Sequence, residues 1–445
     1  MPSEKGISEP ARDSRREELP ALTGLRFVAA FSVLIAHGAA TLLPGYETPL
    51  GVVYWLRQAS GFGMTLFFVL SGFVIHYNYA TLVTEQGLRG VAAYLWARFA
   101  RLYPLFLLML LVNVLVSSRQ IDLWTGHPER FKSTLLALPY FLTSIQSWFY
   151  VPIEGESLIS GIGGGSPLTW SISTEWFFYF AYPCMAWFIL RRRRPGIVLA
   201  LSLLWCGIWI AIATNLHDQS QRIDEWAIGR FGVIAGMQDH QQDSFVRWLL
   251  YFSPYLRMGE FVLGALVAQF YVQMRSRAVT ERENLIGACA MLAAALSVFY
   301  ISYLMYDPDV GMNLFRKMNM NFGLAPAVAV LVFCAARYAG FAHRPLGSRP
   351  VIALGEASYS IYLTHQVVLE IVARRSGQHG LAFDAAKLVG VIAVILLISL
   401  TLYSFYEAPA RKWLRQQWDE PRAVAALAAA PAALALALAG AMYLV

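Results

Sequence analysis

The chain has 445 residues, of which 57% are hydrophobic, 14% aromatic and only 14% charged. Such a composition excludes an ordinary soluble protein and indicates a polytopic membrane protein, whose spans must be helices because backbone groups in lipid need internal partners. The net charge of +7 does not indicate nucleic-acid binding, since the basic residues lie in short clusters between apolar runs. The four cysteines lie inside apolar segments, which disfavours a disulfide framework or a zinc site.

The chain begins with a polar stretch, residues 1–20, which is expected to form a flexible cytoplasmic tail. A signal peptide is the alternative for the apolar run that follows. Arg26 at its entrance and His37 inside it disfavour that alternative. The membrane domain is expected to cover 21–415, and 416–445 is expected to supply a linker and one further membrane helix.

The basic clusters predict how the chain is threaded through an inner (plasma) membrane, with a cytoplasmic N-terminus. Arg101 and Arg191 are both expected inside, yet three apolar runs lie between them. One run therefore cannot be a full crossing. The short run 134–150, which contains Pro139, is expected to be re-entrant or interfacial. The pattern predicts an all-α polytopic bundle of about 10 to 11 transmembrane helices, among them spans over 102–118, 322–340, 351–373 and 385–407.

The first span carries two ionisable residues, Arg26 and His37, which are eleven residues apart. Eleven helical steps return to nearly the same direction, so both share one helix face with an axial separation of about 16 Å. An arginine that snorkels to the headgroups is the alternative for Arg26, and a packing histidine is the alternative for His37. An imidazole this deep in a membrane is costly, which makes a functional role the default reading.

Further polar groups lie in the next spans. Ser71 lies in "FFVLSGFVI", and Arg98 and Arg101 occupy one helical face directly before Pro104. The alternative for the two arginines is a positively charged flank of a helix that begins at Pro104. Glu175 lies among aromatic residues in "LTWSISTEWFFYFAYP". Its carboxyl group must be protonated or have a cationic or hydroxyl partner.

Two later segments also place polar groups inside spans. Arg257 and Glu260 have the i,i+3 spacing of a pair whose charges satisfy each other. The stretch "GEASYSIYLTH" carries Tyr359, Tyr362 and His365. Because these groups are costly in lipid, they are expected to face the bundle interior.

In this order and at these spacings, the segments resemble the signature blocks of the membrane acyltransferase-3 family, the O-acylases of cell-surface glycans and related acceptors. The resemblance extends from about Leu22 to Trp413. No SGNH domain like that of some members is expected, since only an Ala-rich apolar run follows. The matching blocks are Arg26-x10-His37, "FFVLSGFVI", "ARFARLYP", "LTWSISTEWFFYFAYP" and "GEASYSIYLTH".

The resemblance implies transfer of an acyl group, expected to be acetyl, from cytoplasmic acyl-CoA to a hydroxyl of a carbohydrate or glycolipid, without a metal. Guanidinium groups suit the CoA phosphates, and an imidazole can accept the hydroxyl proton. The expected donor-binding residues are Arg26, Arg98 and Arg101, the catalytic residues His37 and Glu175, and the acceptor-binding residues Ser71, Tyr359 and His365. Glu175 is expected to orient the imidazole or to relay its proton.

Two alternatives from other functional classes are a carrier or flippase for a glycan or small solute, in which embedded His and Glu form a proton relay, and a structural or sensory membrane protein. Three arginines at one membrane face, in line with a deeper histidine, favour the enzyme. A carrier gains little from that arrangement, whereas a CoA-dependent enzyme requires it.

Overall fold

The computed structural model describes residues 18–46, 48, 51–116, 128–153, 155–160, 167–191, 194–240, 243–307, 309–340, 342–373 and 379–418. Within these ranges the chain is almost entirely helical, and the strands β1 (Pro152–Ile153) and β2 (Glu156–Ser157) form one short antiparallel sheet. The prediction of an all-α polytopic membrane bundle is confirmed. The expected tail and C-terminal helix lie largely outside the described residues, in 1–17 and 419–445.

Six helical segments of the described chain are long and apolar enough to cross a membrane. They are α1 (Pro20–Leu42), α2 (Val52–Glu85), Gly87–Asn113 of α3 (Gly87–Val116), α7 (Pro195–Asp218), α12 (Glu281–Tyr306), and Leu381–Gln416, which contains α18 (Leu381–Leu402), a π-helical turn (Tyr403–Glu407) and α19 (Ala408–Gln416). The number of crossings, about 10 to 11 from the charge pattern, stays a prediction.

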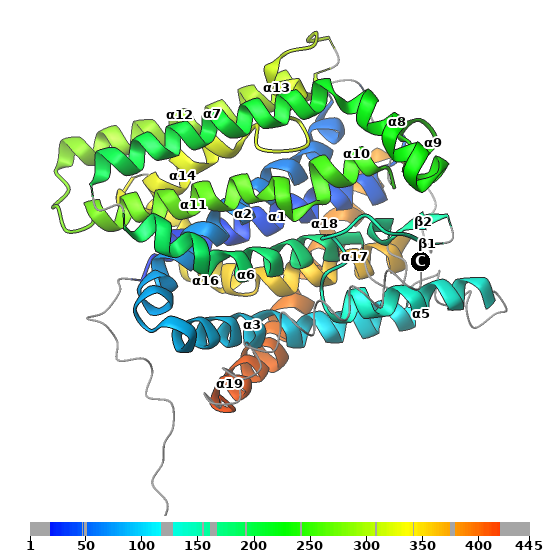
Figure 1. Cartoon of the computed structure of the whole chain (residues 1–445), viewed down its shortest axis with the longest axis horizontal. Helices are drawn as coiled ribbons and strands as arrows, with labels where there is room; N and C mark the ends of the chain where they lie inside the picture. Colours follow the sequence, from blue (N-terminus) through cyan, green and yellow to red (C-terminus); the bar gives the residue numbers. More distant parts are fainter. Residues whose placement is uncertain are drawn as a thin grey trace, which may run out of the picture.

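The remaining helices are shorter or less apolar. They are α5 (Pro128–Leu142), α6 (Trp170–Leu190), α8 (Ser220–Phe231), α9 (Met237–His240), α10 (Phe245–Arg247), α11 (Pro254–Met274), α13 (Leu314–Lys317), α14 (Ala325–Arg337), α15 (His343–Leu346), α16 (Arg349–Glu356) and α17 (Ser358–Ala373). Figure 1 shows the long helices running roughly along one axis, with α7 and α12 on one side and α3 and α5 on the other.

The helix starts follow from local sequence. Pro20, Pro195 and Pro254 lie in the first turns of α1, α7 and α11, where no N–H is needed for an intrahelical bond. Thr280 and Glu283 form a capping box before α12, in which each side chain accepts a hydrogen bond from the backbone N–H of the other. These signals fix where the helices begin, and the apolar runs fix their length.

The centre of the bundle is the close contact of α2 with α11. A Cβ on Gly72 would lie 1.9 Å from the Phe261 carbonyl oxygen, and one on Gly264 would lie 2.0 Å from that of Val69. Both approaches are to backbone atoms, so only glycine fits at either position. Small residues of this kind let membrane helices pack closely without a hydrophobic driving force between them.

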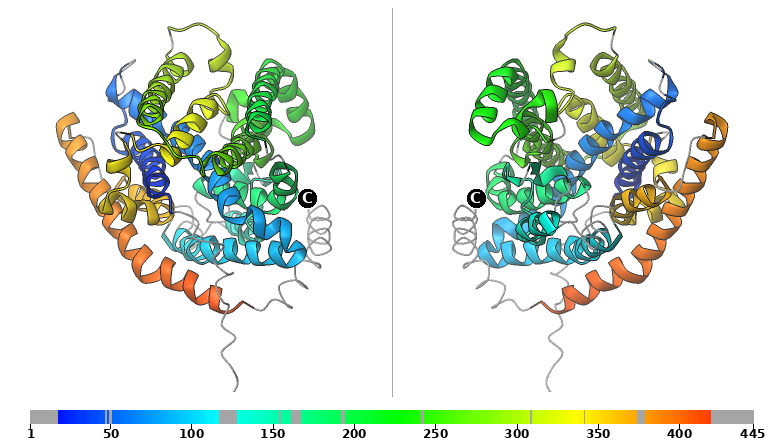
Figure 2. Two further views of the ribbon diagram at one scale, coloured as in Figure 1. Left: turned by 90° about the vertical axis from the view of Figure 1, so that its left-hand side faces the viewer. Right: turned by 90° about the vertical axis from the view of Figure 1, so that its right-hand side faces the viewer.

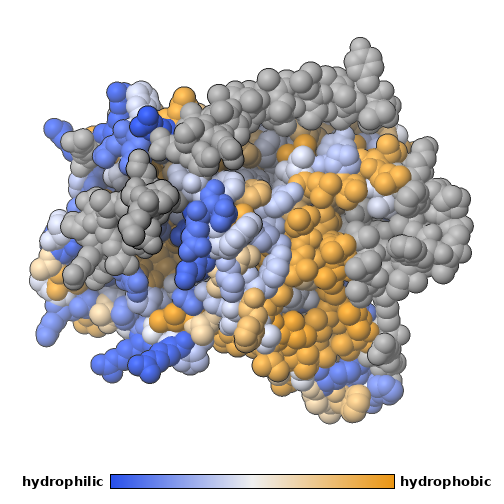
Figure 3. All heavy atoms as spheres, turned by 90° about the horizontal axis from the view of Figure 1, so that it is seen from below, coloured by the Kyte–Doolittle hydropathy of each residue, from blue (hydrophilic) through white to orange (hydrophobic). Residues whose placement is uncertain are grey.

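Large apolar side chains face outward on the peripheral helices. Leu203 on α7, Phe299 on α12 and Leu397 on α18 are 65%, 76% and 67% exposed. Seen from below, hydrophobic residues gather in one broad area beside a more hydrophilic end (Figure 3). An exposed apolar surface of this extent is expected where the protein contacts lipid.

The structure revises several predicted boundaries. The run 134–150 contains the end of α5, a helix of 15 residues, and then turns as far as Tyr150. The helix α5 is therefore shorter than the ~20 residues that a helical span needs. The predicted span 351–373 is divided at Ala357 into α16 and α17, and 322–340 contains only the 13 residues of α14 as regular helix.

The suggestion that a helix begins at Pro104 is wrong, because α3 begins at Gly87 and contains Pro104. The preceding residues are mostly Ala, Leu and Arg, which favour helix. A proline inside a helix removes one hydrogen bond, and packing of the apolar residues around it compensates for that loss. Arg98 and Arg101 are therefore part of a continuous helix.

Candidate active site

A cavity of about 120 Å³ lies among α1, α2, α3, α6 and α17. Six of the eight site residues predicted from the sequence line it: Arg26, Ser71, Arg98, Arg101, Glu175 and Tyr359. The other lining residues are Met64, Phe67, Phe68, Leu70, Val74, Ile75, Leu102, Ser171, Ile172, Tyr179, Ser358 and Tyr362. An apolar cavity with a few converging charged groups is the usual form of a small-molecule site.

Arg98 is 8% exposed, and its guanidinium donates to the Tyr79 hydroxyl at 2.6 Å. The same guanidinium lies 4.6 Å from the centre of the Tyr79 ring. Its Nε atom is buried and has no hydrogen-bond partner in the described part of the chain. A buried unpaired donor is costly, so a ligand or water that accepts a hydrogen bond from this nitrogen would be stabilising.

Arg26 is held by a residue that lies far from it in the sequence. Its guanidinium donates to Ser358 Oγ at 3.0 Å, which joins α1 to the first residue of α17. The charge of Arg26 is repelled by Arg101 and attracted by Glu175 and Glu407. The cavity therefore carries an excess of positive charge that an anion would balance.

The half-buried side chain of Glu175 has hydroxyl partners. Its Oε1 atom accepts from Ser71 Oγ at 2.9 Å, and the Tyr179 hydroxyl also bonds to the carboxylate. These hydroxyl groups are partners of the kind that the sequence analysis required for the Glu175 carboxyl group. They also show Ser71 engaged with Glu175, beside the residues expected to bind the donor.

Tyr359 lines the cavity but uses its hydroxyl elsewhere. The hydroxyl donates to the backbone carbonyl of Leu102 at 2.9 Å, which ties α17 to α3. Tyr362 shares a hydrogen bond with Ser171 Oγ at 2.7 Å and donates to the Leu168 carbonyl at 3.1 Å. These two tyrosines thus fix the wall of the cavity that α17 provides.

The two predicted site residues that do not line the cavity, His37 and His365, contact each other. His37 Nδ1 lies 3.0 Å from His365 Nε2, and the rings are stacked with centroids 5.3 Å apart. His365 is fully buried, and its Nδ1 lies 3.1 Å from the Ile361 carbonyl oxygen. In this structure the residue that contacts the His37 ring is His365, whereas Glu175 bonds to Ser71.

The backbone carbonyl sets the proton positions of this histidine pair. A carbonyl oxygen only accepts, so a neutral His365 must carry its hydrogen on Nδ1 and leave Nε2 as an acceptor. His37 then donates from Nδ1 to His365, and His37 Nε2 keeps its lone pair. The arrangement leaves His37 as a base with one defined tautomer.

Tyr362 connects the cavity wall to the histidine pair. The rings of Phe67 and Tyr362, both lining the cavity, meet edge to face at 5.8 Å. The Tyr362 ring is also 5.8 Å from that of His365. His365 therefore lies next to a residue of the cavity wall, although it does not line the cavity itself.

Glu407 was missed by sequence reasoning. It is 2% exposed, and its Oε2 accepts from Ser360 Oγ at 2.7 Å, while Oε1 has no partner in the described chain. In the sequence it ends the predicted span 385–407, where a carboxylate ordinarily meets water. In the fold, Glu407 lies in the π-helical turn and is buried with its carboxylate against Ser360 of α17.

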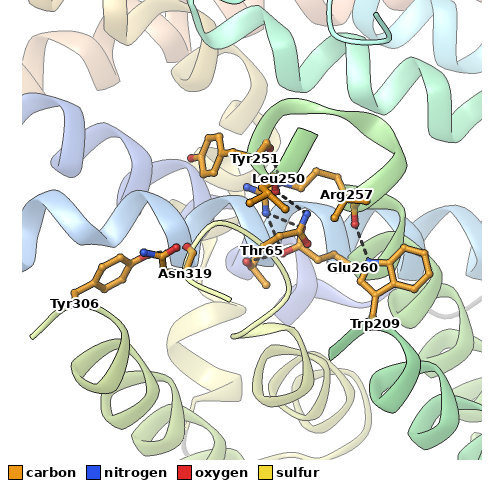
Figure 4. Close-up of polar contacts among 10 residues, drawn as sticks. Thr65, Trp209, Leu250, Tyr251, Arg257, Glu260, Tyr306 and Asn319 are labelled. Atoms are coloured by element: carbon orange, nitrogen blue, oxygen red, sulfur yellow. Dashed lines mark hydrogen bonds and ion pairs between the residues drawn. The ribbon is translucent and has the colours of Figure 1, made fainter. Parts of the chain in front are cut away.

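A second polar cluster lies between α2 and α11 (Figure 4). Arg257 and Glu260 are 2% and 0% exposed and form an ion pair at 3.2 Å, as their spacing predicted. Thr65 Oγ1 donates to Glu260 at 2.8 Å, and Arg257 Nε donates to the Tyr251 carbonyl at 2.8 Å. The cluster satisfies its own charges, which suits a role in packing.

The family model described as an acyltransferase domain matches residues 19–404. The chain is 26% identical over 408 residues to the acyltransferase MdmB of Streptomyces mycarofaciens, covering 89% of this chain and 92% of that protein. It is 22% identical over 413 residues to the O-acetyltransferase OatA of Staphylococcus aureus, covering 88% of this chain and 57% of that protein.

The chain is also 22% identical over 364 residues to the peptidoglycan O-acetyltransferase OatA of Listeria monocytogenes, covering 80% of this chain and 50% of that protein. It thus spans about half the length of the two OatA proteins. No solved structure matches it. The match over residues 19–404, on a membrane bundle whose cavity gathers the residues of the motifs, shows that the chain belongs to the acyltransferase-3 family.

Proposed function

We propose that this membrane acyltransferase moves an acetyl group from cytoplasmic acetyl-CoA to a hydroxyl of a carbohydrate or glycolipid. The acceptor lies at the membrane or its outer face, and the protein lies in the inner (plasma) membrane with a cytoplasmic N-terminus. The names of the two OatA relatives support O-acetyl transfer. MdmB, which is matched over nearly its whole length, supports transfer by the membrane domain alone.

One observation carries the proposal: a cavity lined by three arginines has Tyr362 in its wall, and the Tyr362 ring lies next to His365, which contacts His37. The guanidinium fork matches phosphate oxygens, and Arg98 Nε is buried without a partner in the described chain. The donor's diphosphate is expected at Arg98 and Arg101. Its pantetheine arm is expected to run along the apolar wall toward the histidines.

The dimensions of the donor fit this route. Arg26 and His37 lie on the same helix, α1, and eleven residues correspond to an axial rise of about 16 Å. An extended pantetheine arm measures roughly 15–20 Å by backbone-like bond lengths. A thioester anchored by its phosphates near Arg26 therefore presents its carbonyl at the depth of His37.

His37 performs the proton transfer in the proposed reaction. The acceptor oxygen attacks the thioester carbonyl carbon while His37 Nε2 takes the hydroxyl proton. The C–S bond then breaks, and the leaving CoA sulfur receives the proton back from the imidazolium. His365 accepts the hydrogen bond from His37 Nδ1 throughout, which holds the ring and stabilises its positive charge.

Label transfer tests the proposal. Purified protein in lipid nanodiscs is given acetyl-CoA labelled in the acetyl group, together with an extract of cell-envelope glycans. The enzyme is expected to move the label into the glycan fraction. Label that stays on CoA under every condition, with correctly folded protein, would favour a carrier instead. Mass comparison of envelope glycans with and without the gene identifies the acetylated product.

A further inference from the structure

The helix α19 brings additional cations to the donor end of the cavity. It begins at Ala408, beyond the residues 19–404 that the family model matches. The run from α18 to α19 passes around the outside of the bundle and ends beside α3 (Figures 1 and 2). Trp96 Nε1 of α3 donates to the Leu414 carbonyl at 3.0 Å. This contact docks α19 within one turn of Arg98.

Arg415 on α19 lies in the field of the donor-site arginines. Its charge is repelled by Arg98, Arg101 and Arg411, and attracted by the oxygen of Tyr79. The Tyr79 hydroxyl accepts a hydrogen bond from Arg98. The same hydroxyl also interacts electrostatically with Arg101 and Arg415. Like charges gathered this way repel one another, and an anion among them would relieve the repulsion.

Neither Arg415 nor Arg101 forms an ion pair with a carboxylate in the described ranges, whereas Arg277 and Lys317 elsewhere do. Arg415 is exposed and does not line the cavity. Trp96 and Tyr79, through which α19 approaches Arg98, do not line the cavity either. The cations therefore form a series, with Arg98 and Arg101 inside the cavity and Arg415 outside it.

From this order we propose that Arg415 binds the 3′-phosphate at the nucleotide end of the coenzyme A donor, so that α19 completes the donor site. This inference rests on the proposed function. In CoA the thioester, pantetheine, diphosphate and ribose 3′-phosphate follow one another along the molecule. With the thioester at His37 and the diphosphate at Arg98 and Arg101, the next anion lies outside the cavity, beside the guanidinium of Arg415.

A lipid headgroup offers the same phosphate chemistry. Lys412 and the 60%-exposed Trp413 neighbour Arg415 on α19, as on helices that lie at a membrane interface. The position of Arg415 beside Tyr79 and Arg98 favours the donor. An experiment distinguishes the donor phosphate from a lipid phosphate if the donor loses its 3′-phosphate while the lipid composition stays the same.

The test compares acetyl-CoA with acetyl-dephospho-CoA, which lacks only the 3′-phosphate, in detergent with neutral lipid. For the unmodified protein, the KM for acetyl-dephospho-CoA is expected to be about 10- to 100-fold the KM for acetyl-CoA, as for loss of a charged hydrogen bond. Arg415→Gln should raise the KM for acetyl-CoA by a similar factor and leave that for acetyl-dephospho-CoA unchanged. Lys412→Gln, an exposed neighbour, should keep the full preference.

Each other outcome has a distinct meaning. If Arg415→Gln retains the preference for acetyl-CoA, or raises both KM values equally, the inference is overturned. It is also overturned if Arg415→Gln alters only the response to added phosphatidylglycerol vesicles, since the cation then serves lipid. If the unmodified protein transfers no acetyl group from acetyl-CoA, the proposed function itself fails. Unchanged kcat with acetyl-dephospho-CoA shows that Arg415→Gln is folded.

Discussion

His37 Nδ1 lies 3.0 Å from His365 Nε2, although the two residues are 328 positions apart in the chain. The contact joins α1 to α17 and gives His37 one tautomer, because His365 is itself fixed by the Ile361 carbonyl. Removing the acceptor should therefore impair proton transfer more than it impairs donor binding.

The first prediction concerns His365. Replacement by Leu removes the acceptor and should lower kcat by about 10- to 100-fold, the usual effect of losing a group that orients a functional histidine. His365→Gln keeps an acceptor oxygen and should restore much of the rate. The donor KM should change little in either variant. Equal damage by Leu and Gln, accompanied by a lower unfolding temperature, would assign His365 to packing.

The second prediction concerns the donor arginines. Arg98→Ala and Arg101→Ala should each raise the donor KM by about 10- to 100-fold, since each removes charged hydrogen bonds to phosphate. The loss should be largest at low ionic strength and should narrow as salt screens the charges. Donor titrations at several salt concentrations measure this. Arg222→Ala on α8 is the control, and unchanged affinity in both cavity variants would contradict donor binding there.

The third prediction concerns the contact of α2 with α11. Gly72→Val and Gly264→Val place atoms where backbone carbonyls already lie, about 2 Å from the new Cβ. Overpacking of this kind costs about 1–3 kcal/mol or more. Thermal unfolding in detergent should show lower midpoints for both. Gly207→Val is the matched control, because nothing lies within 4 Å of its Cβ position. Equal midpoints for all three would show that the helices can separate freely.

The fourth prediction concerns the buried pair of Arg257 and Glu260. Changing Glu260 to Leu alone leaves Arg257 as an uncompensated buried charge, which costs about 3–5 kcal/mol. The double variant Arg257→Met with Glu260→Leu should recover most of that loss. Unfolding midpoints of the single and double variants test this. A double variant no more stable than the single one would mean that the charges do more than satisfy each other.

The sequence correctly predicted which side chains share a helix face and which face the interior of the bundle, because these properties depend on position within one helix. The spacing of Arg26 and His37 placed them on one face, and α1 contains both. The positions of Arg98, Ser71 and Glu175 within apolar runs predicted that they face the interior, and all three line one cavity. Helical periodicity and the cost of charge in lipid are local properties, so one chain suffices to infer them.

Contacts between distant helices could not be predicted in the same way. Periodicity gives the direction of a side chain but not the partner it meets, so the bond from Arg26 to Ser358 appears only in the fold. The pairing of His365 with His37 and the burial of Glu407 have the same origin. The start of α3 was misplaced because a proline marks a helix start more often than it lies inside one.

The central claim is that His37 transfers the proton while the arginines bind the donor. Its most direct test is to measure acetyl transfer and equilibrium acetyl-CoA binding on the same preparation of His37→Ala. His343→Ala on α15 is the control. The account predicts a rate about 10²–10⁴-fold below that of the unmodified protein, as for loss of a general base, with donor affinity nearly unchanged. A His37→Ala protein that transfers acetyl groups at the normal rate would contradict it.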